Sequence, residues 1–275
     1  MRWIVGIDQR DRSRGAIEMA AWLRAHSHAP DEQQLYGLHV LEGRLDDPDV
    51  RARLVTDAHR AIDRSIAAPT PLAELHVGDG TAVEESLQRY ADVIGAEAML
   101  IGRIGTREIG GITRLGKVAR RMLRSSEYPV VVVPPDLQRT AIGAGAIVLA
   151  TDLGPASASA ARFARRLATA CERELLVLHV DGAITPAYPE LTISPGPELA
   201  DVIAWARHHE LEPTRVRLAR GDVVEHVLAV ASEEHAPLIV VGSRRLTLGE
   251  RIFGSSLGTD LARVADRAVA VVPPA

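Results

Sequence analysis

The chain has one cysteine, Cys171, among its 275 residues. An internal disulfide and a cysteine-based metal site are therefore excluded. Positive charge is not in excess either, since the formal net charge is −4 at pH 7, and nothing marks a general binder of nucleic acid or membrane surfaces. The sequence has no charged leader and no run of about 20 apolar residues. We therefore expect a cytoplasmic protein that binds neither nucleic acid nor a membrane.

The common catalytic motifs are missing as well. The sequence contains no Gly-Lys-Ser/Thr P-loop and no metal-binding histidine pair at helical spacing with a glutamate. Catalysis on a nucleotide would need a positioned base and usually a metal carboxylate. No hydrolytic arrangement of residues stands out, so we do not expect an enzyme, although a weak ATPase stays open.

A glycine-rich stretch in the middle of the chain does carry a signal. The apolar residues 98–101 lead into Gly102 and Gly105, and Gly116 and Lys117 open a helical stretch. Glycine lets the backbone turn freely and lets a ligand approach without a Cβ in the way. The free N–H groups and the dipole of a helix N-terminus favour an anion. The stretch has the outline of a phosphate cradle, but most such loops only turn the chain.

The same layout occurs twice, which makes it more informative. Residues 238–257 repeat the strand, the loop and the start of a helix, and an apolar run follows at 268–272. Earlier stretches match too: residues 3–8 correspond to 146–152, and residues 34–40 correspond to 174–180, including a shared Leu-His-Val. We also match the Gly-Asp pair at Asp79 with the pair at Asp222, each before a helix.

Hydrophobic periodicity gives strands that alternate with helices. In the first half we expect strands at 2–7, 35–41, 73–77, 98–101 and 130–133. We expect one helix that begins at 14, a second that covers 50–66 and a third that ends at about 91. A turn at 78–80 would allow Asp79 or Thr81 to cap the third helix. In the second half we expect strands at 146–152, 174–180, 215–220, 237–242 and 268–272, and helices at 156–171, 198–210 and 223–234.

Apolar strands joined by helical crossovers imply a parallel sheet that is covered on both faces. We therefore predict an α/β protein with two repeated doubly wound domains, residues 1–138 and 144–275, separated by a Pro- and Gly-rich linker. Ligands of such sheets bind beyond the carboxyl ends of the strands. Asp8, Val40 and the Gly102 loop fall at those ends in the first half; their counterparts are Asp152, Val180 and the Gly242 loop.

With these residues in place, the chain resembles the universal stress protein family, as a tandem protein of two such domains. The resemblance implies twin five-stranded parallel sheets flanked by helices, of the adenine nucleotide alpha hydrolase-like type. It also implies that ATP or AMP, with or without Mg²⁺, binds at the glycine loop. The last strand of family members commonly pairs domains, so the halves should form a pseudo-dimer through Val130–Val133 and Ala268–Val272, and a homodimer stays open.

Both loops depart from the family pattern. In the first, the interval from Gly105 to Gly116 is one residue longer, and Lys117 stands where a hydroxyl is expected. A lysine loses that hydroxyl but adds a cation that could reach a phosphate. In the second, Arg245 replaces the second glycine and the interval to Gly254 is one residue shorter.

The resemblance places candidate nucleotide-binding residues at the strand ends and in the loops. For the two aspartates the alternative is capping of the following turn, and for the two valines it is ordinary strand-end packing. For His39 and His179 we favour a core or interface role, and we place Arg103 in the site. The candidates are Asp8, Val40, Gly102, Arg103, Gly105, Gly116, Lys117, Val118, Asp152, Val180, Gly242, Ser243, Gly254, Ser255 and Ser256.

These observations lead to one functional hypothesis and two alternatives. The hypothesis is a non-enzymatic stress-response protein that binds an adenine nucleotide and signals through its bound state or its partners. The first alternative is an interaction module without nucleotide, in which both pockets are degenerate. The second is a slow ATP hydrolase.

Overall fold

The computed structural model describes residues 1–8, 13–29, 33–43, 47–66, 70–103, 115–182, 196–211, 214–243 and 256–274. In the first half the strands are β1 Arg2–Gly6, β2 Gln34–Glu42, β3 Glu74–Gly80, β4 Ala98–Gly102 and β5 Val130–Val133. The helices there are α1 Arg14–Ala25, α2 Pro48–Ser65, α3 Val83–Ile94 and α4 Lys117–Ser125.

The second half repeats this order after a 3₁₀ turn, η3 Arg139–Ala141. Its strands are β6 Ile147–Thr151, β7 Leu175–Asp181, β8 Arg215–Arg220, β9 Leu238–Gly242 and β10 Ala268–Val272. Its helices are α5 Ala158–Ala170, α6 Leu199–His208, α7 Val223–Glu233 and α8 Leu257–Val264, and a second 3₁₀ turn, η4 Pro155–Ser157, precedes α5. The prediction of two repeated α/β halves is confirmed.

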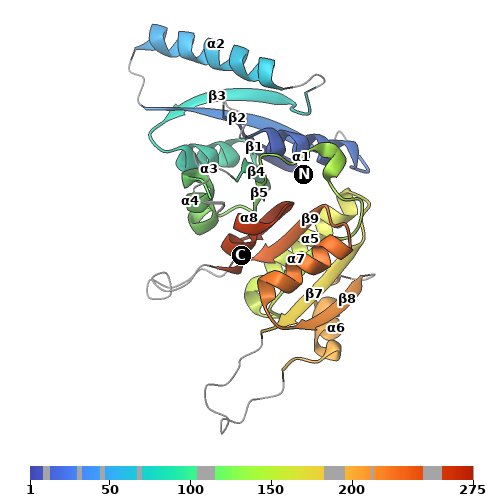
Figure 1. Ribbon diagram of the computed structural model, residues 1–275. Helices are drawn as coiled ribbons and strands as arrows, with labels where there is room; N and C mark the ends of the chain where they lie inside the picture. The colour runs from blue at the N-terminus through green and yellow to red at the C-terminus, as the bar shows by residue number, and fades with distance from the viewer. Residues whose placement is uncertain are drawn as a thin grey trace, which may run out of the picture.

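The described strands form one ten-stranded sheet, in the order β3-β2-β1-β4-β5-β10-β9-β6-β7-β8 (Figure 1). Each half contributes five parallel strands, as predicted. The two five-stranded sheets are continuous rather than separate, because β5 and β10 pair antiparallel, with Val132 opposite Val269, and join the halves edge to edge within the two ranges that the resemblance implied. Unpaired strand edges seek hydrogen-bond partners, and these short all-apolar strands satisfy each other.

Helices cover both faces of the sheet. One core lies between the sheet and the helices α1, α2, α5 and α6, and the other lies between the sheet and α3, α4, α7 and α8. Both cores include residues of both halves. The strands read as continuous apolar runs because both of their faces are buried. Among the described residues, no helix is long and apolar enough to span a membrane.

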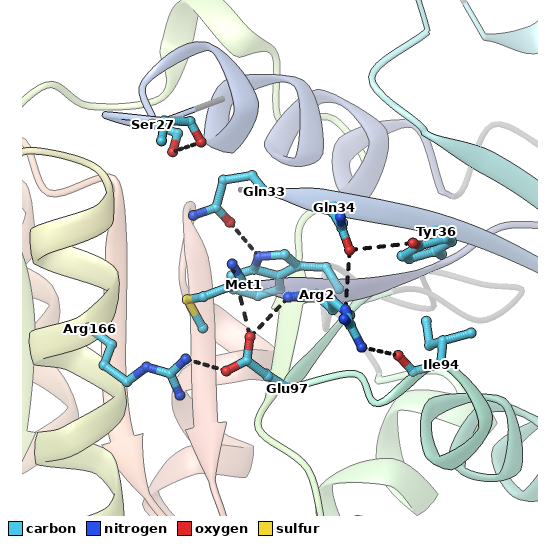
Figure 2. A network of polar contacts seen from close by, with 11 residues as sticks. Met1, Arg2, Ser27, Gln33, Gln34, Tyr36, Ile94, Glu97 and Arg166 are labelled. Carbon is cyan, nitrogen blue, oxygen red and sulfur yellow. Dashed lines mark hydrogen bonds and ion pairs between the residues drawn. The ribbon is translucent and has the colours of Figure 1, made fainter. Parts of the chain in front are cut away.

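Side chains also bridge the halves beside the pairing of β5 and β10. The Trp3 ring on β1 meets the Phe163 ring on α5 edge to face, with ring centroids 6.1 Å apart. The Glu97 carboxylate accepts a hydrogen bond from the backbone N–H of Arg2 at 3.0 Å and another from the Arg166 guanidinium on α5 (Figure 2). Burial by itself would raise the pKa of Glu97, but the hydrogen bonds from Arg166 and Arg2 outweigh it and lower the pKa.

The start of α3 differs from the sequence prediction. The turn at 78–80 is wrong, because β3 continues to Gly80, and neither Asp79 nor Thr81 caps α3: its N-cap is Ala82, which makes no side-chain capping bond. Asp79 instead forms an ion pair with Arg51 at 2.8 Å. Asp222 does cap α7, accepting from Glu225 N at 2.8 Å. The proposed match of Asp79 with Asp222 is therefore wrong, and Ala82 holds the matching place.

Candidate nucleotide-binding site

The candidate site of the first half lies where β1, β2 and β4 end. β1 pairs with β2 on one side and with β4 on the other, which brings Asp8, Val40 and Gly102 to one edge of the sheet. This edge is the carboxyl end of the parallel strands, where ligands of doubly wound sheets bind. The topology thus gathers three candidates that lie far apart in the sequence.

A buried histidine fixes the end of β1. The Nδ1 atom of His39 on β2 donates to the carbonyl oxygen of Ile7 at 2.8 Å, directly before Asp8. The Asp8 backbone N–H donates to the Ser13 hydroxyl at 3.2 Å, which ties the end of β1 to the start of α1. The second half repeats the first contact, with His179 Nδ1 donating to Thr151 O at 2.8 Å. Both histidines are buried, and they position the backbone that carries the aspartates.

The two ends of the first glycine loop meet. Arg103 N donates to Val133 O at 2.8 Å, and Gly116 N donates to Arg103 O at 2.9 Å. Gly116 is the N-cap of α4, so the loop closes directly onto the helix N-terminus, as the sequence predicts. Gly105 and residues 104–114 lie outside the described residues.

The N-termini of α4 and α8 have different electrostatics. α4 begins at Lys117, its N-cap Gly116 makes no side-chain capping bond, and its first turn holds no acid. Lys117 is exposed. In the second half Ser256 caps α8 itself, accepting from Thr259 N at 3.3 Å, and Asp260 lies in the first turn. The dipole of α4 favours an anion at its N-terminus, and no acidic residue lies in the first turn of this helix.

The aspartate of the second half is engaged in its own turn. Asp152 Oδ1 accepts from Gly154 N at 2.9 Å and from the Ser157 hydroxyl at 2.7 Å. This is the turn-capping alternative that the sequence left open. Gly242 also has a structural reason for lacking a side chain: a Cβ there would lie 3.2 Å from Ala156 O.

Several other candidates have contacts that the sequence did not indicate. The Arg103 guanidinium donates to the carbonyl oxygen of Ala265, just beyond α8 in the other half. Val40 and Val180 are both 8% exposed and their side chains belong to a hydrophobic core, so only their main chain is available at the strand end. Val118 packs against the same core. Ser243 N donates to Val272 O at 2.7 Å, and Gly254 and Ser255 lie outside the described residues.

The sequence did not indicate the hydrogen bond of Ser13 to Asp8, nor that His39 and His179 bind the backbone at the ends of β1 and β6. The repeated Leu-His-Val was the available signal, because a polar side chain recurs inside two otherwise apolar strands. Nothing in the sequence marked Arg103 as a contact to the other half. Within the described ranges, no three His, Cys, Asp or Glu side chains gather into a possible metal site.

Both halves of the chain match one protein family. The sequence model of the universal stress protein family matches residues 1–134 and again residues 144–273. The chain belongs to the universal stress protein family. It holds two copies of the family's domain in tandem, in agreement with the resemblance seen in the sequence.

Solved structures share the fold over the whole chain. A universal stress protein from Archaeoglobus fulgidus DSM 4304 is 15% identical, with a TM-score of 0.69, over 99% of this chain and 96% of that one. A functionally unknown protein from Pseudomonas aeruginosa PAO1 is 14% identical, with a TM-score of 0.65, over 99% and 92%. A putative universal stress protein from Pseudomonas aeruginosa UCBPP-PA14 is 14% identical, with a TM-score of 0.62, over 99% and 93%. No curated protein matches the chain.

Proposed function

We propose that this universal stress protein binds ATP or AMP in its first half and acts in the stress response of the cytoplasm by binding rather than by catalysis. The base and ribose would lie at the ends of β1 and β2, near Asp8 and the main chain of Val40. The phosphates would lie at the N-terminus of α4, near Gly116 and Lys117. The second half would hold no nucleotide and would serve the fold.

The observation that carries the proposal is the contrast between α4 and α8. At α4 the helix N-terminus has no side-chain cap of its own, no acid in the first turn, and Lys117 as its first residue. At α8 the hydroxyl of Ser256 occupies that place and Asp260 adds a negative charge. Polyphosphate is attracted to backbone N–H groups beside a cation and repelled by a carboxylate.

The two halves also differ at the strand ends, because one carboxylate oxygen of Asp152 accepts hydrogen bonds from Gly154 and Ser157 of its own turn. A Cβ on Gly242 would also lie only 3.2 Å from Ala156 O, so the η4 turn closely approaches the end of β9. Both observations support a second half that is closed by its own groups. Neither depends on the contrast between α4 and α8.

Thermal unfolding with added ligand tests nucleotide binding. A ligand that binds only the folded state at 100 times its Kd stabilises it by about 2.7 kcal/mol. For a chain of this size that shift raises Tm by roughly 5–10 °C. ATP and AMP should raise Tm and adenosine should do so less, in Mg²⁺ and in EDTA alike. No shift at millimolar nucleotide would favour the interaction module without nucleotide, and phosphate release would favour the hydrolase.

Lys117 offers a direct reporter, because it is the only lysine in the chain. Reductive methylation with ¹³C keeps the charge and gives its side chain one signal, beside that of the terminal amine. ATP should shift the Lys117 signal, and adenosine should leave it in place. An unmoved signal in the presence of bound ATP would put the phosphates elsewhere.

A matched pair of variants locates the phosphates by affinity. Lys117→Gln should raise the Kd for ATP roughly tenfold, which corresponds to the loss of about 1.4 kcal/mol. Arg124→Gln removes a cation from the last turn of the same helix and should leave the Kd unchanged. Equal effects of the two variants would indicate general electrostatic attraction instead of a phosphate site.

A further inference from the structure

The two outer strands of the sheet occupy equivalent places but are protected differently. β3 ends the order of described strands on one side and β8 ends it on the other. β8 carries three arginines, each paired with an acid of the chain: Arg215 with Glu234 at 2.5 Å, Arg217 with Glu233 at 2.7 Å, and Arg220 with Asp181 at 3.8 Å. Charged side chains along an edge discourage the addition of another strand.

β3 carries no lysine or arginine. Its charged side chains are Glu74 and Asp79, and only Asp79 has a cation, Arg51, among the described residues. Glu74 is exposed and forms no ion pair in the described part of the chain. His76 stacks on the Tyr90 ring of α3 with ring centroids 4.8 Å apart, and Glu74 lies two residues before His76, on the same face of β3.

A groove borders the start of β3 on the opposite face. It has a volume of about 330 Å³ and lies between the last turn of α2 and the segment that enters β3, at the end of the sheet where Figure 1 shows α2 beside β3. Its apolar wall includes Ile66, Leu72 and Leu75, and Asp63 and Glu74 also line it. The groove lies at the amino end of the strands, away from the candidate nucleotide site.

We propose that β3 is a docking edge for an extended, basic segment of a partner protein. The segment adds a strand to β3 through main-chain hydrogen bonds, which is a recurrent mode of peptide recognition. Side chains of a strand alternate between its faces. Apolar side chains of the segment then enter the groove at Ile66, Leu72 and Leu75, and lysine or arginine side chains meet Glu74 on the other face.

The charge of the proposed partner follows from the edge itself. Glu74 and Asp63 both lie beside the groove at this edge, and the structure pairs neither with a cation of the described residues. A basic segment gains attraction at both, whereas an acidic one is repelled. The β8 edge allows a comparison within the same protein, because its arginines already form ion pairs with acidic residues of the chain and it should not bind the basic segment.

A synthetic probe tests the docking edge. The peptide acetyl-Lys-Val-Lys-Val-Lys-amide presents valines on one face and lysines on the other. It should slow hydrogen exchange of the β3 amides, residues 74–80, and leave exchange at β8, residues 215–220, unchanged. The same peptide with alternate backbone nitrogens methylated keeps its charge but loses donors, and should give no protection.

Two variants complete the test. Glu74→Lys should weaken binding of the peptide roughly tenfold, whereas Glu233→Lys on the opposite edge should leave it unchanged. Absence of protection at millimolar peptide, equal protection by the methylated peptide, or protection at β8 would overturn the proposal. Sedimentation that shows a dimer broken by Glu74→Lys would also overturn it, because a second copy would then occupy the edge.

Discussion

Replacement of Phe163 by alanine tests whether the two halves unfold together. Phe163 belongs to the second half, is 6% exposed and packs its ring against Trp3 of the first half. Removing a buried phenylalanine side chain costs about 3–5 kcal/mol. Because Trp3 is fully buried and the core is continuous across the halves, the cost should lower the stability of both.

The assay is equilibrium unfolding in urea, read by fluorescence. The chain has three tryptophans, Trp3 and Trp22 in the first half and Trp205 in the second. In a Trp205→Phe background the fluorescence reports the first half alone. Phe163→Ala should shift this first-half transition to lower urea, and Tm should fall by roughly 6–20 °C.

A control and a clear counter-result complete this prediction. Val264 on α8 is 49% exposed, so Val264→Ala should change the free energy of unfolding by less than about 0.5 kcal/mol. If Phe163→Ala destabilised only the second half and left the first-half transition in place, the halves would be independent folding units. The reasoning from a shared core would then be refuted.

Three other predictions concern packing, charge and the thiol. A Cβ on Gly15 would lie 1.8 Å from the carbonyl oxygen of Pro134, so Gly15→Ala should cost about 3 kcal/mol or prevent folding, measured by urea unfolding. The lowered pKa of Glu97 means that its ion pair with Arg166 stabilises the protein above the unfolded pKa of about 4.5 and is lost as pH falls through the lower folded pKa. Arg166→Ala should therefore cost no more than about 1 kcal/mol at pH 7 and nothing once Glu97 is protonated, and an equal cost at pH 3 would contradict the ion pair. Burial raises the pKa of Cys171 to about 12, so iodoacetamide should label it only when urea unfolds the chain, and rapid labelling of the native protein would argue against the buried position.

Much of the local structure was readable from the sequence. Apolar runs such as Val130–Val133 gave the buried strands, and Gly116 followed by Lys117 gave the start of α4. The error at Asp79 has a local cause, because Gly-Asp-Gly is typical of a turn. Here the residues stay in β3, and Arg51 from α2 binds the aspartate.

Candidate site residues were harder to judge because their partners lie elsewhere in the chain. The sequence allowed Asp152 to bind a ligand or to cap its own turn, and only the positions of Gly154 and Ser157 decide between these contacts. Arg103 was placed in the site, yet its guanidinium reaches Ala265 in the other half. No periodicity in the sequence records such a contact.

By itself, the sequence determined the duplication, the alternation of strands and helices, and the family, because each depends on residues that are neighbours in the chain. The tertiary structure decided that the pairing of β5 with β10 makes one continuous sheet with cores that both halves share, and that the starts of α4 and α8 differ in capping. Those features depend on which distant groups meet, and only the packing of the complete chain settles that.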